Sequence, residues 1–139
     1  MDPPVKYRSV YLPVVRDSLP RSLDVLDFAE PSLVIGTRER SHTADQGLYF
    51  LNNSFVQDQA KAMAVRLLAM PISNSERPFS NSKRLEEAFR LAYSRPATES
   101  EISAAVAFLQ NFQTPEDELL QWTSLCQAIF ASAEFRYVN

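Results

Sequence analysis

The sequence predicts an all-α fold, a compact bundle of about five helices preceded by an extended or irregular N-terminal segment. Three observations predict it. Apolar residues recur at helical spacing through residues 43–139, and helix start signals precede most of these stretches. The chain also has two glycines against nine prolines, so few residues can adopt the positive φ angles of tight β-hairpins.

The length and composition suit a single domain. A chain of 139 residues is long enough to bury a core, and 45% hydrophobic against 22% charged residues argues against wholesale disorder. We expect one helical domain over residues 1–139. Residues 1–42 form an extended, loop-rich lead-in with one short helix, and residues 43–139 form the helical core.

The lead-in contains a β-prone stretch that a proline interrupts. Val10, Tyr11, Val14 and Val15 favour a strand, but Pro13 removes a backbone donor in their midst. An edge-like or coil segment laid over the core is therefore expected. Residues 21–28 are predicted to form two helical turns with three apolar side chains facing inward, namely Leu23, Leu26 and Phe28, and residues 29–42 to form a loop.

Capping boxes predict where the first core helices begin. The spacing of Thr43 and Gln46 predicts a short helix that ends near Leu51. The same spacing from Ser54 to Gln57 predicts the next helix, over residues 54–70, which Pro71 ends. Phe55 and Val56 are among the apolar residues that recur at helical spacing in this helix and are expected to face inward.

The second half contains three further predicted helices. They cover residues 82–93, 98–112 and 115–133, and the second begins with a capping box from Thr98 to Glu101. The last carries an apolar stripe of Leu119, Trp122, Leu125, Cys126, Ile129 and Phe130. Because the connecting loops are short, these helices are expected to pack antiparallel as neighbours.

Several classes of function are disfavoured by composition. The net charge is −3 and neither half is a basic block, so we expect no nucleic-acid partner. No run of about 18 apolar residues exists, so no membrane span is expected. The first four residues, Met1 to Pro4, do not resemble a signal peptide, because they lack a charged and an apolar region.

The sequence contains few residues that could act as a catalytic nucleophile or as a metal ligand. Cys126 and His42 are the only residues of their types, so a catalytic dyad is conceivable. Cys126 lies on the apolar stripe, however, and a buried structural thiol is the favoured interpretation. One Cys and one His make a zinc site or haem attachment improbable, so we expect no metal and no cofactor. The Ser80-x-x-Lys83 pattern is interpreted as a helix start.

The segment from Gly36 to Asn53 is the most concentrated group of polar residues. The candidate ligand or partner contacts in it are Arg38, Arg40, His42, Thr43, Gln46, Asn52 and Asn53. Loops on rigid scaffolds often carry function, which favours a binding site. The favoured alternative is a hydrogen-bonded brace that satisfies loop backbone groups. At the end of the segment, Ser54 is interpreted as the cap of the following helix.

Several stretches resemble a planctomycete-specific domain of unknown function. They are residues 8–16, 26–31, 51–56 and 91–96, then Glu99, Glu101, and residues 122–138. The chain is similar to the C-terminal half of that domain, which lies at the C-terminus of large proteins with cytochrome-c-like domains. The resemblance implies an extracytoplasmic, multidomain parent protein and no established enzymatic activity.

Three functional hypotheses remain. The first is a noncatalytic scaffold or interaction module that packs against the remainder of its parent or another protein, with an exposed apolar patch at residues 10–15 or 135–138. The second is a carbohydrate- or small-ligand-binding module with exposed aromatic rings, such as Tyr49, Phe50 or Trp122. The third is a hydrolase-like enzyme that uses Arg38, His42 and Asp45.

Overall fold

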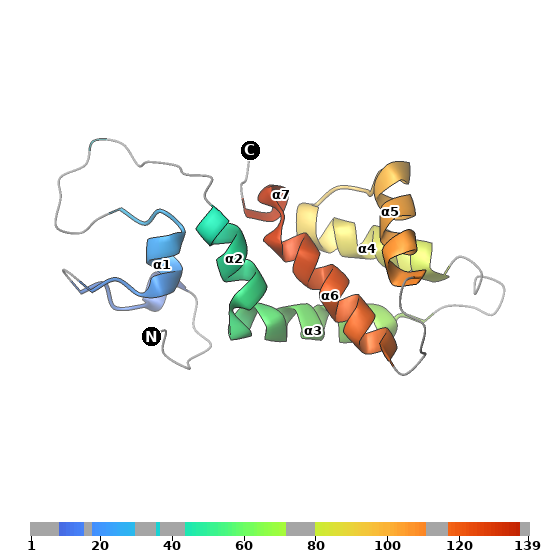
Figure 1. Ribbon diagram of the computed structural model, residues 1–139, viewed down its shortest axis with the longest axis horizontal. Coiled ribbons are helices and arrows are strands. Elements are labelled where there is room, and N and C mark those ends of the chain that lie inside the picture. Colours follow the sequence, from blue (N-terminus) through green and yellow to red (C-terminus); the bar gives the residue numbers. More distant parts are fainter. Residues whose placement is uncertain are drawn as a thin grey trace. The chain divides into compact units, whose positions relative to one another are not determined.

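The predicted all-α class is confirmed. The computed structural model describes residues 9–15, 18–29, 36, 44–71, 80–110 and 117–136. Within these ranges the chain forms seven α-helices and one 3-10 turn (Figure 1). Val15 and Ser18 form an isolated antiparallel bridge, and the described residues contain no strand.

The helices follow the predicted order with shifted ends. Their bounds are η1 (Ser9–Tyr11), α1 (Arg21–Val25), α2 (Ala44–Asn52), α3 (Ser54–Leu68), α4 (Ser80–Tyr93), α5 (Glu99–Gln110), α6 (Glu118–Ala131) and α7 (Ala133–Arg136). The last predicted helix, over residues 115–133, corresponds to α6, which ends at Ala131 because Ser132 adopts an extended conformation (φ −66°, ψ 154°). The sequence did not predict α7. None of the helices in the described part of the chain is long and apolar enough to span a membrane.

The chain divides into two compact units. The first unit spans Met1–Tyr49 and the second spans Phe50–Asn139. The division falls within α2, seven residues after the predicted boundary between lead-in and core. The prediction of a single domain over the whole chain stays a prediction.

The hydrophobic core lies in the second unit. Helices α3 and α6 make the most extensive contact, and α4 and α5 complete the bundle. The core is formed by buried residues of these four helices, namely Ala60, Ala64, Leu67, Leu85, Ala88, Phe89, Ala105, Leu109, Trp122, Leu125, Cys126 and Ile129. Their spacing of three or four residues along each helix is the period that the sequence predicted.

The turn between α4 and α5 redirects the chain. Ser94 follows α4 with φ 58°, in the left-handed region, and its N–H donates to the carbonyl oxygen of Arg90 at 3.0 Å. Pro96 then prevents the helix from continuing. In Figure 1, α5 runs across α4 rather than along it, so the antiparallel packing predicted for this pair is wrong.

Four side chains predicted to face inward are exposed. Leu26 and Phe28 lie beyond the end of α1. This helix has only five residues, and none of the five is buried. Phe55 and Leu119 lie in the first turns of α3 and α6, and both are exposed. Because an α-helix buries only one stripe, the packing of neighbouring helices decides which apolar side chains lie inside.

Candidate functional site

The predicted polar segment is described only in part. Arg38, Arg40, His42 and Thr43 lie outside the described residues, so their role as ligand or partner contacts stays a prediction. Asp45 is exposed in the first turn of α2. The convergence of Arg38, His42 and Asp45 that a hydrolase would need also stays untested.

Gln46 joins two helices of the first unit. It is 2% exposed, and its Nε2 donates to Oδ2 of Asp27 at 3.1 Å. Asp27 has φ 56° and follows α1 in a Schellman motif, in which the Phe28 N–H donates to the carbonyl oxygen of Leu23 at 3.0 Å. This hydrogen bond between two side chains links the end of α1 to the start of α2. The predicted role of the segment in satisfying loop backbone groups stays a prediction.

Asn53 caps α3, and Asn52 is exposed at the end of α2. The Oδ1 atom of Asn53 accepts hydrogen bonds from the N–H of Phe55 (2.9 Å) and of Val56 (3.3 Å). The prediction of Ser54 as the cap is therefore wrong by one residue. Gln57 does not reach back as in a capping box; its Nε2 donates to the carbonyl oxygen of Leu51 at 3.3 Å.

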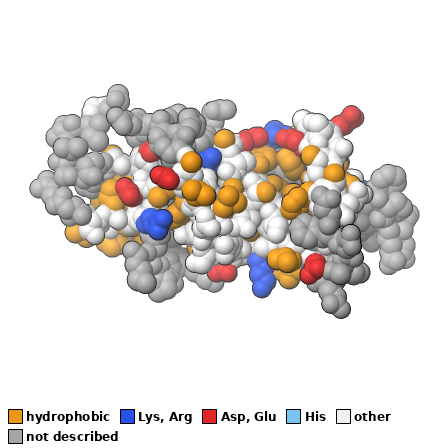
Figure 2. All heavy atoms as spheres, viewed as in Figure 1, with side chains coloured by type: hydrophobic (Ala, Val, Ile, Leu, Met, Phe, Trp, Pro, Cys, Tyr) orange, Lys and Arg blue, Asp and Glu red, His pale blue; other side chains and the backbone are white. Residues whose placement is uncertain are grey.

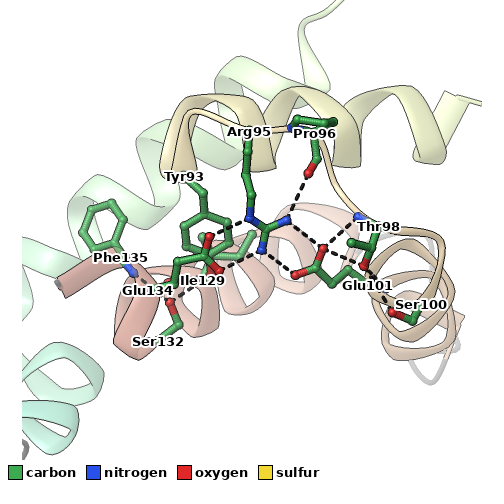
Figure 3. Close-up of polar contacts among 10 residues, drawn as sticks. All are labelled: Tyr93, Arg95, Pro96, Thr98, Ser100, Glu101, Ile129, Ser132, Glu134 and Phe135. Carbon is green, nitrogen blue, oxygen red and sulfur yellow. Dashed lines mark hydrogen bonds and ion pairs between the residues drawn. The ribbon is translucent and has the colours of Figure 1, made fainter. Parts of the chain in front are cut away.

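Another polar cluster among the described residues lies where α4, α5 and α7 meet. Figure 3 shows Arg95 between two carboxylates, and we call Arg95, Glu101 and Glu134 the Arg95 clamp. Glu101 accepts from Nη1 (3.0 Å) and Nη2 (2.7 Å), and Glu134 accepts from Nε (2.6 Å) and Nη2 (2.7 Å). Nη1 also donates to the carbonyl oxygen of Pro96 at 3.0 Å. These contacts use all five N–H donors of the guanidinium group.

Glu101 also completes the capping box predicted at the start of α5. Its Oε2 accepts from the Thr98 N–H and from the Thr98 hydroxyl, both at 2.8 Å. The Thr98 hydroxyl oxygen in turn accepts from the Glu101 N–H at 3.3 Å. This carboxylate therefore has two tasks, since it caps a helix and pairs with Arg95.

Two aromatic rings lie close to the guanidinium group of Arg95. The guanidinium carbon of Arg95 lies 5.4 Å from the ring centroid of Tyr93 and 5.8 Å from that of Phe89. The Tyr93 hydroxyl donates to Oγ of Ser132 at 2.9 Å, between α6 and α7 (Figure 3). A cation over these ring faces is attracted by their negative potential, which fixes the position of Arg95.

The electrostatics keep the clamp ionised at neutral pH. Hydrogen bonds from Arg95 and from the Thr98 backbone lower the pKa of Glu101 to about 2. The hydrogen bonds from Arg95 also lower the pKa of Glu134, and both carboxylates raise the pKa of Arg95. A general acid or base works best with a pKa near the working pH, so these groups are unsuited to proton transfer. The arrangement suits the joining of α4, α5 and α7.

Cys126 and Trp122 are both in the core. The Cys126 side chain is fully buried, and burial raises the pKa of its thiol to about 12, which makes it a poor nucleophile at neutral pH. Trp122 is 1% exposed, so its ring is not available to stack on a sugar. The described residues contain no group of three His, Cys, Asp or Glu side chains that could hold a metal ion.

Comparison with known proteins identifies a family. The family described as PSD1, protein of unknown function (DUF1553), matches residues 2–109. The chain belongs to the PSD1 family. No curated protein and no solved structure matches it.

The match to PSD1 ends before the bundle is complete. Residue 109 lies in the last turn of α5, so α6 and α7 are beyond the matched range. These helices supply Trp122, Leu125, Cys126 and Ile129 to the core and Glu134 to the Arg95 clamp. The folded unit of this PSD1 chain therefore includes helices outside the matched residues.

The first unit of this PSD1 chain exposes a short apolar stretch. Its members in the segment before α1 are Val10 (79% exposed), Tyr11 (73%), Val14 (43%) and Val15 (57%). Figure 2 shows hydrophobic side chains at the surface in the region that carries α1. We call Val10, Tyr11, Val14 and Val15 the N-terminal apolar surface. It lies at one of the two places where the sequence predicts an exposed patch; at the other, Phe135 is half-buried and Val138 is outside the described residues.

Proposed function

We propose that this PSD1 chain is a noncatalytic helical interaction module whose N-terminal apolar surface packs against the remainder of its own parent protein. The observation that carries the proposal is the exposure of that surface, with Val10 and Tyr11 each more than 70% exposed. Exposed apolar groups lose contact with water when a partner covers them, which favours association.

The small number of buried side chains in the described part of the first unit supports the proposal. Among its described residues only Gln46 is buried, and that side chain is polar. Apolar burial is the main favourable term in folding, so a unit with so little of it gains stability from a partner surface. The resemblance to domains of large proteins with cytochrome-c-like regions favours an intramolecular partner in an extracytoplasmic parent.

The experiment is a binding measurement with the separately expressed remainder of a homologous full-length parent. The chain is immobilised, and saturable binding of the remainder is expected. Val15→Asp places a charge in the N-terminal apolar surface and is expected to weaken binding about tenfold or more, since a buried unpaired charge is costly.

Leu120→Asp is the matched control. Leu120 and Val15 are each 57% exposed, but Leu120 lies on α6 in the second unit. The control is expected to bind like the unaltered chain. Absence of binding by the unaltered chain, or equal losses in both variants, would contradict the proposal.

A further inference from the structure

Helix α7 is too short to be stable without contacts to the rest of the second unit. It has four residues, none of them buried, and follows the extended residue Ser132. The first turn of a helix fixes the backbone angles of several residues but forms only one hydrogen bond, so its formation is unfavourable in free energy. A helix of four residues is therefore unstable alone. Contacts with the rest of the second unit must therefore hold it.

Three sets of contacts hold α7 and the residue before it. Glu134 accepts two hydrogen bonds from Arg95, at 2.6 and 2.7 Å. The Ser132 hydroxyl accepts from Tyr93 at 2.9 Å and from the Phe135 N–H at 3.2 Å. The Phe135 ring lies 4.8 Å from that of Phe130 and 6.3 Å, edge-on, from that of Phe50.

The two carboxylates of the Arg95 clamp differ in what their loss would cost, and this difference permits the release of α7. Glu101 would keep its two hydrogen bonds to Arg95 and its bonds to Thr98 if Glu134 moved away. Arg95 would still have a paired charge, and only two of its five donors would need new partners. The Arg95 side chain is 33% exposed, so water can reach these donors. Release therefore leaves no charge buried and unpaired.

We propose that α7 is a latch that opens as a unit while α3 to α6 stay folded, and that its opening uncovers the rings of Phe50 and Phe130. The closed position depends on the Glu134 half of the Arg95 clamp, and the Glu101 half is the fixed part. The inference concerns the second unit and does not rest on the proposed function of the N-terminal apolar surface.

Amide hydrogen exchange of the full chain, measured residue by residue by NMR, tests the latch. In the unaltered chain, the Phe135 amide is expected to exchange faster than the amides of Leu125 in α6 and Ala105 in α5. Glu134→Gln removes the charge at the latch and is expected to speed exchange at Phe135 about two- to fivefold, the range that an exposed ion pair supplies. Leu125 and Ala105 are expected to keep their rates.

Glu99→Gln is the matched control, because Glu99 is also exposed but lies outside the Arg95 clamp, at the start of α5. It is expected to leave Phe135 unchanged. Equal protection of Phe135 and Leu125 in the unaltered chain would mean that α7 opens only with global unfolding, and would overturn the proposal. An unchanged Phe135 rate in Glu134→Gln would overturn it as well, because Glu134 would then not hold the latch.

Discussion

The two units of the chain differ in what they bury. The second unit buries a core of apolar side chains from four helices, including the whole indole ring of Trp122. In the described part of the first unit, the one buried side chain is that of Gln46, which is held by Asp27. The second unit is stabilised by apolar burial, whereas the described contacts of the first unit include hydrogen bonds at helix ends and the bridge between Val15 and Ser18.

The difference indicates which unit can fold without a partner. Burial of apolar surface contributes roughly 25 cal/mol for each Å² removed from water, whereas one hydrogen bond contributes about 1 kcal/mol net. We therefore expect the second unit to unfold cooperatively by itself and the first to depend on a partner surface.

Truncation gives the largest expected effect. A chain that ends at Gln110 loses α6, which contributes Trp122, Leu125, Cys126 and Ile129 to the core. We expect it to show no cooperative unfolding in a urea titration followed by far-UV circular dichroism. A chain of residues 50–139 is expected to keep a cooperative transition, and its loss would contradict the comparison.

Trp122→Ala is next in size. It leaves a cavity in the core of the second unit, and the expected loss is about 3–5 kcal/mol in the free energy of unfolding. The measurement is chemical denaturation followed by circular dichroism, since the only Trp is removed. Leu120→Ala, on the exposed face of the same helix, should change the free energy by less than about 0.5 kcal/mol. Similar losses in both variants would argue against the described core.

Asn53→Ala tests the cap of α3. The side chain accepts two backbone hydrogen bonds, so its removal is expected to cost about 1 kcal/mol of unfolding free energy. Ser54→Ala should cost less than about 0.5 kcal/mol, because Ser54 is inside the helix. Denaturation curves of the two variants decide between the observed cap and the one that the sequence suggested.

Acid should weaken the second unit through the Arg95 clamp. The pKa of Glu101 is lowered from its ordinary value of 4.5 to about 2, so the folded state binds its proton more weakly than the unfolded state. The stabilisation is complete above pH 4.5 and is lost as pH falls towards 2. In Glu101→Gln the free energy of unfolding should depend less steeply on pH in this window. If the free energy of unfolding of the variant depends on pH as steeply as that of the unaltered chain, Glu101 is not a cause of the acid sensitivity.

Gln46→Ala has the smallest expected effect on the second unit. The variant loses the hydrogen bond to Asp27 in the first unit, and the free energy of unfolding of residues 50–139 should change by less than about 0.5 kcal/mol. Faster amide exchange near Asp27 is expected at the same time. A large loss of stability in the second unit would show that the two units unfold together.

Local signals in the sequence predicted much of the fold. Helical periodicity and the Thr98 to Glu101 capping box gave the α-helical class and the start of α5, because both depend on residues a few positions apart. The cap of α3 was misplaced because Asn53 and Ser54 are both good capping residues, and only the backbone geometry distinguishes them.

The Arg95 clamp could not be found in the same way. Arg95 and Glu134 are 39 residues apart, and their contact depends on how α6 brings α7 back to the end of α4. The exposure of Phe55 and Leu119 was also missed, since it depends on the neighbours of each helix. Periodicity indicates that a helix has an apolar face, but it does not indicate how wide the buried part is.

The left-handed residue Ser94 has a consequence for how this chain can vary. Exposed loops usually tolerate added residues, but the turn from Ser94 to Thr98 sets where Arg95 lies relative to two carboxylates on different helices. One inserted residue would displace the guanidinium group by up to about 3.5 Å, more than a hydrogen bond can stretch. Homologous chains that keep the Arg95 clamp are therefore expected to keep the length of this turn, even where the residues themselves differ.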